Sequence, residues 1–126
     1  MILGLDISSS ITGVTVIDET GTALFCDHFD TRNKNKFPTL SKIIGIVSYI
    51  CLELFDLHPE YIASTSARKL CGIKVPRGTK AKEFVLNFLL DTDPSFVIQC
   101  TRHGNPKPGF YDRADSLVIA RAGLEL

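Results

Sequence analysis

The chain has 126 residues, 44% hydrophobic and 22% charged, and its formal net charge is zero. This length and composition predict one globular domain with a single core, and they exclude a membrane span, because no apolar run reaches the roughly 18 residues that one needs. The N-terminus lacks the basic region of a signal peptide, and four cysteines without a CxxC pair or zinc-ligand histidines predict reduced thiols in a cytoplasmic protein.

The first thirty residues predict three antiparallel strands joined by short turns. The strands are ILGLDIS, TGVTVID and ALFCDHFD, and ETGT is the turn before the third strand. Asp6 interrupts the apolar first strand. A buried carboxylate is costly unless a cation or a hydrogen-bond network compensates it. We therefore expect Asp6 to be compensated structurally or used for chemistry.

A polar segment, DTRNKNKFP, separates these strands from a long predicted helix over residues 39–56. Apolar residues recur there at helical spacing: Leu40, Ile43, Ile44, Val47, Ile50, Cys51 and Leu54. Ile46 and Tyr49 widen the apolar surface beyond one stripe. We expect this helix to be deeply buried or to pair with another subunit, and we expect the EYIASTS segment after it to form one further strand.

The charges of the chain are unevenly distributed. Residues 1–63 hold 4 Lys/Arg against 8 Asp/Glu, whereas residues 64–126 hold 10 against 6. The basic excess gathers in RKLCGIKVPRGTKAK, which contains no acid and carries Arg68, Lys69, Lys74, Arg77, Lys80 and Lys82. Such an unmixed run favours a polyanionic partner over the alternative, a solvated loop.

The C-terminal half predicts two more helices. KAKEFVLNFLL is amphipathic, FVIQC is a short strand or a helical turn, and HGNPKPGFY is a Gly/Pro-rich loop. The chain closes with a helix over DRADSLVIARAGLEL.

Asp112 and Asp115 lie three residues apart, on one face of the first turn of this last helix. Acids in a first turn can simply cap the helix. If the helix packs beside the first strand, however, Asp6 joins them. Three neighbouring carboxylates repel one another unless a hard divalent cation neutralises them, and carboxylate-bound Mg²⁺ is suited to phosphodiester hydrolysis. The basic run would then grip the phosphate backbone.

Three blocks of the chain resemble the RuvC family of Holliday-junction resolvases, bacteriophage-type members above all. The blocks are ILGLDISSSITGVTVID, SARKLCGIKVPRGTKAKEFV and YDRADSLVIARAGL, in the family's order. The resemblance implies an α/β domain of ribonuclease H-like type, with a mixed sheet (an antiparallel meander plus a parallel strand) flanked by helices. It also implies an endonuclease that cuts four-way or branched DNA during recombination, in the cytoplasm of a bacterium or a phage-infected cell.

Position by position, the resemblance implies that Asp6, Asp112 and Asp115 ligate Mg²⁺ or Mn²⁺. It places Lys69 and Lys82 near the scissile phosphate, where Lys82 would stabilise developing charge. The remaining cations would follow the DNA backbone: Arg68, Lys74, Arg77 and Lys80. The helix over residues 39–56 would be the dimerisation helix, and a symmetric dimer suits two matched cuts.

One part of the family pattern is missing. RuvC-like enzymes carry a second acid, a glutamate that ends a central strand, but here the chain passes almost directly into SKIIGIVSYI. About ten residues cannot hold a helix and a strand. The central region is therefore shortened near Leu40 and Ser41, and Glu53 and Glu60 are poor substitutes for the missing acid. The segment is deleted, or a partner or another acid replaces it, or it belongs to a longer native protein.

Several alternatives stay open. The chain can be a catalytically impaired binder of DNA junctions, or a ribonuclease H-like nuclease that acts on RNA or simple duplex. GLDISSSITG also resembles the phosphate-binding turn of actin-like ATPases and sugar kinases, but those need a second lobe and a D-x-G-G loop. We expect His28 and His58 to be structural, and His103 has a weaker claim to touch phosphate or move a proton.

Overall fold

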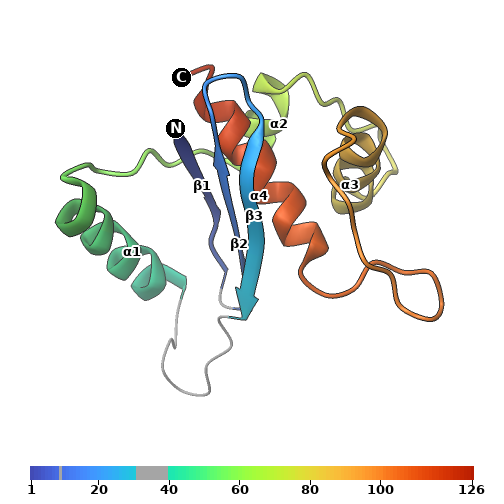
Figure 1. The fold of residues 1–126 in the computed structure, drawn as a ribbon, viewed down its shortest axis with the longest axis horizontal. Helices are drawn as coiled ribbons and strands as arrows, with labels where there is room; N and C mark the ends of the chain where they lie inside the picture. The colour runs from blue at the N-terminus through green and yellow to red at the C-terminus, as the bar shows by residue number, and fades with distance from the viewer. Residues whose placement is uncertain (9, 31–39) are drawn as a thin grey trace.

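The computed structural model describes residues 1–8, 10–30 and 40–126 (Figure 1). Three antiparallel strands form a sheet in the order β1-β2-β3: β1 (Ile2–Asp6), β2 (Ile11–Ile17) and β3 (Ala23–Asp30). The helices are α1 (Leu40–Phe55), α2 (Ser64–Leu70), α3 (Ala81–Thr92) and α4 (Phe110–Gly123). The chain is thus an α/β protein.

The strand register aligns side chains in rows across the sheet. Gly4 pairs with Thr15, and two residues further along β1, Asp6 pairs with Gly13, which in turn pairs with His28 on β3. Directly opposed residues share a face of a sheet, and so do residues two apart on one strand. Asp6, Gly13 and His28 therefore form one transverse row on the face that carries Gly4 and Thr15.

Helix α4 lies directly on this face because two of its positions lack side chains. A Cβ atom on Gly4 would lie 2.6 Å from the backbone of both Ser116 and Ala120, and one on Gly13 would overlap the backbone carbonyl of Asp112. No real Cβ atom tolerates such contacts, so glycine at both positions is what lets the helix reach the strands. The first turn of α4 consequently sits above Gly13, next to Asp6.

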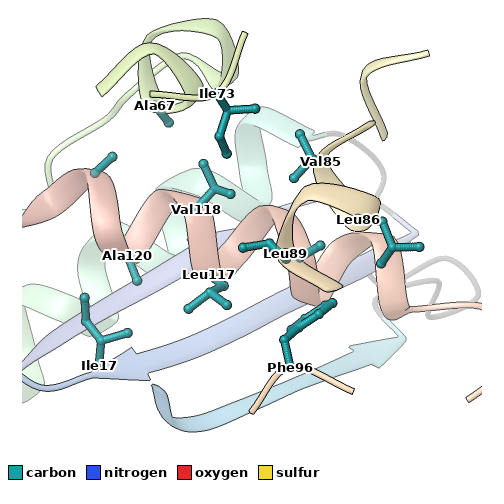
Figure 2. Close-up of a cluster of buried hydrophobic side chains, with 12 residues drawn as sticks. Ile17, Ala67, Ile73, Val85, Leu86, Leu89, Phe96, Leu117, Val118 and Ala120 are labelled. Atoms are coloured by element: carbon teal, nitrogen blue, oxygen red, sulfur yellow. The ribbon is translucent and has the colours of Figure 1, made fainter. Parts of the chain in front are cut away.

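The core lies on both sides of α4 (Figure 2). Below it, Thr15 and Ser116 are fully buried and share a 2.7 Å hydrogen bond between their hydroxyl groups. Above it, α2 and α3 pack against the helix and do not reach the sheet. The buried apolar cluster joins residues of all these elements: Ile17, Ala67, Ile73, Val85, Leu86, Leu89, Phe96, Leu117, Val118 and Ala120.

The opposite face of the sheet is much less covered. Phe25 and Phe29, on that face of β3, are 52% and 53% exposed. Within the described residues, α1 packs against no other helix or strand, and Figure 1 shows it standing apart from β1. A cavity of about 970 Å³ lies between them, and it is lined mainly by apolar residues of β1, of α1 and of the segment 57–64.

Most predicted elements are confirmed, and three features differ. FVIQC forms neither a strand nor a helical turn: residues 96–99 are irregular, and Cys100 makes an isolated bridge with Pro106. The EYIASTS segment is not a strand: residues 57–63 are irregular, and α2 begins at Ser64. That prediction was wrong: the segment pairs with neither edge strand of the described sheet, β1 or β3, and the small residues of STSARKL allow a short helix that buries Ala67. All strands described are antiparallel, so the expected parallel strand is not among them.

No helix in the described ranges is both long enough and apolar enough to cross a bilayer.

Candidate functional site

Three carboxylates gather where the end of β1 meets the start of α4. Asp6 is the last residue of β1 and lies on the α4 side of the sheet, beside Gly13. Asp112 packs its backbone carbonyl against Gly13, and Asp115 follows one helical turn later. The structure therefore brings together the three acids, from sequence positions more than a hundred residues apart.

The pKa values of the three carboxyl groups are all raised. The pKa of Asp6 is raised to about 6, first by burial and then by repulsion from Asp115 and Asp112. Burial and the charge of Asp112 likewise raise the pKa of Asp115 to about 6. The pKa of Asp112 is raised too, mainly by burial. The charge of Asp112 thus makes both Asp6 and Asp115 harder to ionise, and that of Asp115 does so for Asp6.

Two cations of the basic segment face this cluster. Lys82, near the start of α3, lowers the pKa of Asp6, Asp112 and Asp115, and Arg68 on α2 lowers that of Asp115. None of the ion pairs found among the described residues involves one of the three acids. The cations therefore reduce the negative potential at a distance without neutralising it.

The other cations of the basic segment are exposed. They are Lys69 at the end of α2, and Lys74, Arg77 and Lys80 in the connection to α3. This connection turns at Gly72 and Gly78, both of which have positive φ. The basic segment thus includes part of a helix, α2, that its sequence did not reveal.

The donor set suits a hard divalent cation, which prefers carboxylate oxygens. Burial first, and then the charges of neighbouring carboxylates, raise the pKa values of Asp6 and Asp115, and a bound cation would favour the ionised form of both groups. As the side chains lie, however, no three His, Cys, Asp or Glu residues in the described part of the chain are close enough together to hold one ion. Rotation of the aspartate side chains would be needed to complete such a site.

The remaining sequence candidates lie on α1, in the segment that follows it and in the segment before α4. Glu53 is exposed on α1, and Glu60 and His58 are exposed residues that line the cavity beside β1. Asp6 also borders this cavity. His103 is exposed at a tight turn of the 99–107 segment, where an isolated bridge pairs Cys100 with Pro106.

His28 and Arg113 form a connected pair that the sequence analysis missed. Nε of Arg113 donates a 2.7 Å hydrogen bond to Nδ1 of His28, and a terminal nitrogen of the same guanidinium lies 2.8 Å from Oδ1 of Asp27. The guanidinium also stacks 4.5 Å from the ring centroid of Phe110. Side chains alternate between the two faces of a strand, so His28 lies on the face of β3 that α4 covers. This alternation was the one sequence signal for the contact with Arg113.

The site therefore consists of three carboxylates, two facing cations and a histidine–arginine pair at the start of α4. Its chemistry has to be inferred from these side chains. No family model matches the chain, and neither does any curated protein or solved structure.

Proposed function

We propose that the protein is a metal-dependent endonuclease of ribonuclease H-like, RuvC type that cleaves four-way or branched DNA junctions. One observation carries the proposal: Asp6, Asp112 and Asp115 converge at a sheet–helix junction, carry raised pKa values, and face Lys82 and Arg68. Among the described residues, neither the three acids nor these two cations form an ion pair, and such a cluster suits a phosphate ester that brings a divalent cation with it.

In this proposal Asp6, Asp112 and Asp115 would hold Mg²⁺ or Mn²⁺. The bound ion would activate water and stabilise the leaving oxygen. Lys82 would stabilise negative charge that develops on the scissile phosphate, because its ammonium group already acts on all three acids. Arg68 would hold a phosphate oxygen on the Asp115 side of the cluster.

The DNA backbone would continue from the site over the exposed basic segment. Its residues project from α2 and from the turns before α3: Lys69, Lys74, Arg77 and Lys80. Contacts of this kind position the nucleic acid without reading its sequence, and they make binding strongly salt-dependent.

Cleavage of a synthetic four-way junction tests the proposal. We expect paired nicks with Mg²⁺ or Mn²⁺, none with EDTA, and at least a 1,000-fold lower rate for Asp6→Asn. The matched control is Asp91→Asn, which removes an exposed carboxylate of α3 and should leave the rate unchanged. The assay follows labelled strands of the junction beside a linear duplex of the same sequence.

Tight, salt-sensitive binding without nicking would contradict catalysis and favour the alternative, a junction binder on the same fold. The observation that favours this alternative is the missing fourth acid: Glu53 is exposed on α1, and neither Glu53 nor Glu60 is among the charges that shift the pKa values of Asp6, Asp112 and Asp115. Equal cleavage of junction and duplex would contradict the branched substrate only.

We further propose a homodimer formed through α1. Tyr49 and Leu54 are 64% and 70% exposed, and the helix is apolar around most of its circumference. Large apolar patches on a surface are typical of interfaces. Two sites related by a two-fold axis would cut opposing strands.

Sedimentation measures this interface. Ile50→Glu should convert a dimer into a monomer, because it places a charge at the apolar surface of α1. Val97→Glu is the matched control, since Val97 is also exposed but lies outside α1. A wild-type protein that sediments as a monomer at micromolar concentration would contradict the dimer.

A further inference from the structure

We infer that His28 and Arg113 are positioning residues that fix the Asp112 carboxylate relative to Asp6. The inference rests on the proposed function, because it assigns these two side chains a role in holding the metal site together. Neither side chain is itself offered as a metal ligand or as a group that reacts.

The first step is the place of His28 in the sheet. It pairs directly with Gly13, whose other partner is Asp6, so one transverse row supports the first turn of α4. A Cβ atom on Gly109 would overlap the imidazole ring of His28. The ring thus fills the space beside Gly109, and β3 packs against the residue that precedes α4.

The second step is the hydrogen bond from Arg113. Because Nδ1 of His28 accepts from Nε of Arg113, the neutral ring carries its proton on Nε2. Arg113 is held in turn by Asp27 and by the ring of Phe110. His28 and Phe110 also meet edge to face, with their ring centroids 6.0 Å apart. Four side chains therefore hold one another in place: those of Asp27, His28, Phe110 and Arg113.

The third step is that the residue before α4 supplies no side-chain cap. This residue is Gly109, in the left-handed conformation with φ of 98°, and the N–H of Phe110 donates instead to the backbone carbonyl of Lys107. Asp112 is the third residue of the helix. Its placement above Gly13 depends on the contacts that anchor Phe110 and Arg113 on either side of it.

Partners behind the ligands of a metal site commonly change metal affinity by 10–100-fold when they are removed. We expect His28→Phe, which keeps a ring but loses the acceptor for Arg113, to weaken Mn²⁺ binding at least 10-fold. His28→Asn keeps an acceptor near the position of Nδ1 and should restore affinity to within about 3-fold of the wild type.

The measurement is Mn²⁺ titration by electron paramagnetic resonance on the full chain, with thermal unfolding and junction cleavage recorded beside it. Asp93→Asn is the matched control. It removes the 2.5 Å ion pair with Arg121 near the other end of α4, so it destabilises the same helix away from the acids. A merely structural role for His28 would move unfolding in both variants and Mn²⁺ affinity in neither.

Weaker Mn²⁺ binding by His28→Phe, with affinity kept by His28→Asn and Asp93→Asn, is the expected result. If the wild type binds Mn²⁺ and cleaves junctions, and His28→Phe binds Mn²⁺ equally well, this inference is overturned. The proposed function would then still stand. A wild type that neither binds Mn²⁺ nor cleaves would overturn both.

Discussion

Gly13→Ala is expected to lower the free energy of unfolding by about 3 kcal/mol, as inserted atoms do in tightly packed sites. The added methyl group would overlap the backbone carbonyl of Asp112 and lie 3.1 Å from Cβ of Ser116. Backbone cannot rotate away as a flexible side chain can, so the first turn of α4 must lift from the sheet. Urea unfolding followed by circular dichroism measures the loss.

Gly45→Ala is the matched control for this substitution. Gly45 lies inside α1, and no atom comes within 4 Å of the position that a Cβ would take. Alanine there should stabilise the protein by up to about 1 kcal/mol, because it favours the helix. If Gly13→Ala were as stable as the wild type, α4 would not contact β2 as described, and the convergence of Asp112 with Asp6 would fail with it.

The sequence predicted the elements well because their patterns are local. The three strands follow from β-branched runs and turns, and α1, α3 and α4 from helical spacing and their end signals. The 7-residue α2 was missed because so short a helix, with one buried residue, leaves no periodic pattern. The EYIASTS strand was expected from the length of the segment alone, and length does not show whether the segment reaches the edge of a sheet.

The acids of the site were predictable, and their surroundings were not. Asp6 stood out as a carboxylate in an apolar strand, and the spacing of Asp112 and Asp115 put them on one helix face. The His28–Arg113 contact joins residues 85 positions apart, and no local pattern encodes it. The close approach at Gly13 is equally non-local, since a glycine in a strand has several explanations.

The double variant Asp6→Asn/Asp115→Asn is expected to be more stable than the wild type in metal-free buffer at pH 7.5. The pKa of each carboxyl group rises from 3.8 to about 6 on folding, so the folded chain holds these protons more tightly than the unfolded chain. Ionisation at neutral pH therefore opposes folding. Allowing for solvent screening of these partly exposed groups, we expect a gain of about 2 kcal/mol.

The gain should depend on pH in a defined window. Wild-type stability falls as the pH rises from about 4 to above 6, because the folded chain loses protons that the unfolded chain has already lost. The asparagine side chains do not titrate, so the advantage of the variant should vanish below pH 4. Urea unfolding at several pH values, with EDTA present, measures this difference.

Asp18→Asn is the control with the opposite sign. A hydrogen bond from the Thr20 hydroxyl, 2.6 Å long, is the main cause that lowers the pKa of the exposed Asp18 carboxyl group. Its ionisation favours folding, so this variant should lose stability above pH 4 and match the wild type at lower pH. A double variant that behaved like Asp18→Asn would contradict the raised pKa values of Asp6 and Asp115, which burial causes first and neighbouring carboxylates increase.

Millimolar Mn²⁺ should reverse the order of stability. A cation that binds only the folded wild type adds stability in proportion to the logarithm of its concentration, whereas the asparagine variant has lost two charged ligands. We expect the wild type to become the more stable protein, while Asp18→Asn keeps its deficit unchanged. If Mn²⁺ stabilised both proteins equally, the carboxylates of Asp6 and Asp115 would not be its ligands. The three acids would then not form a metal site.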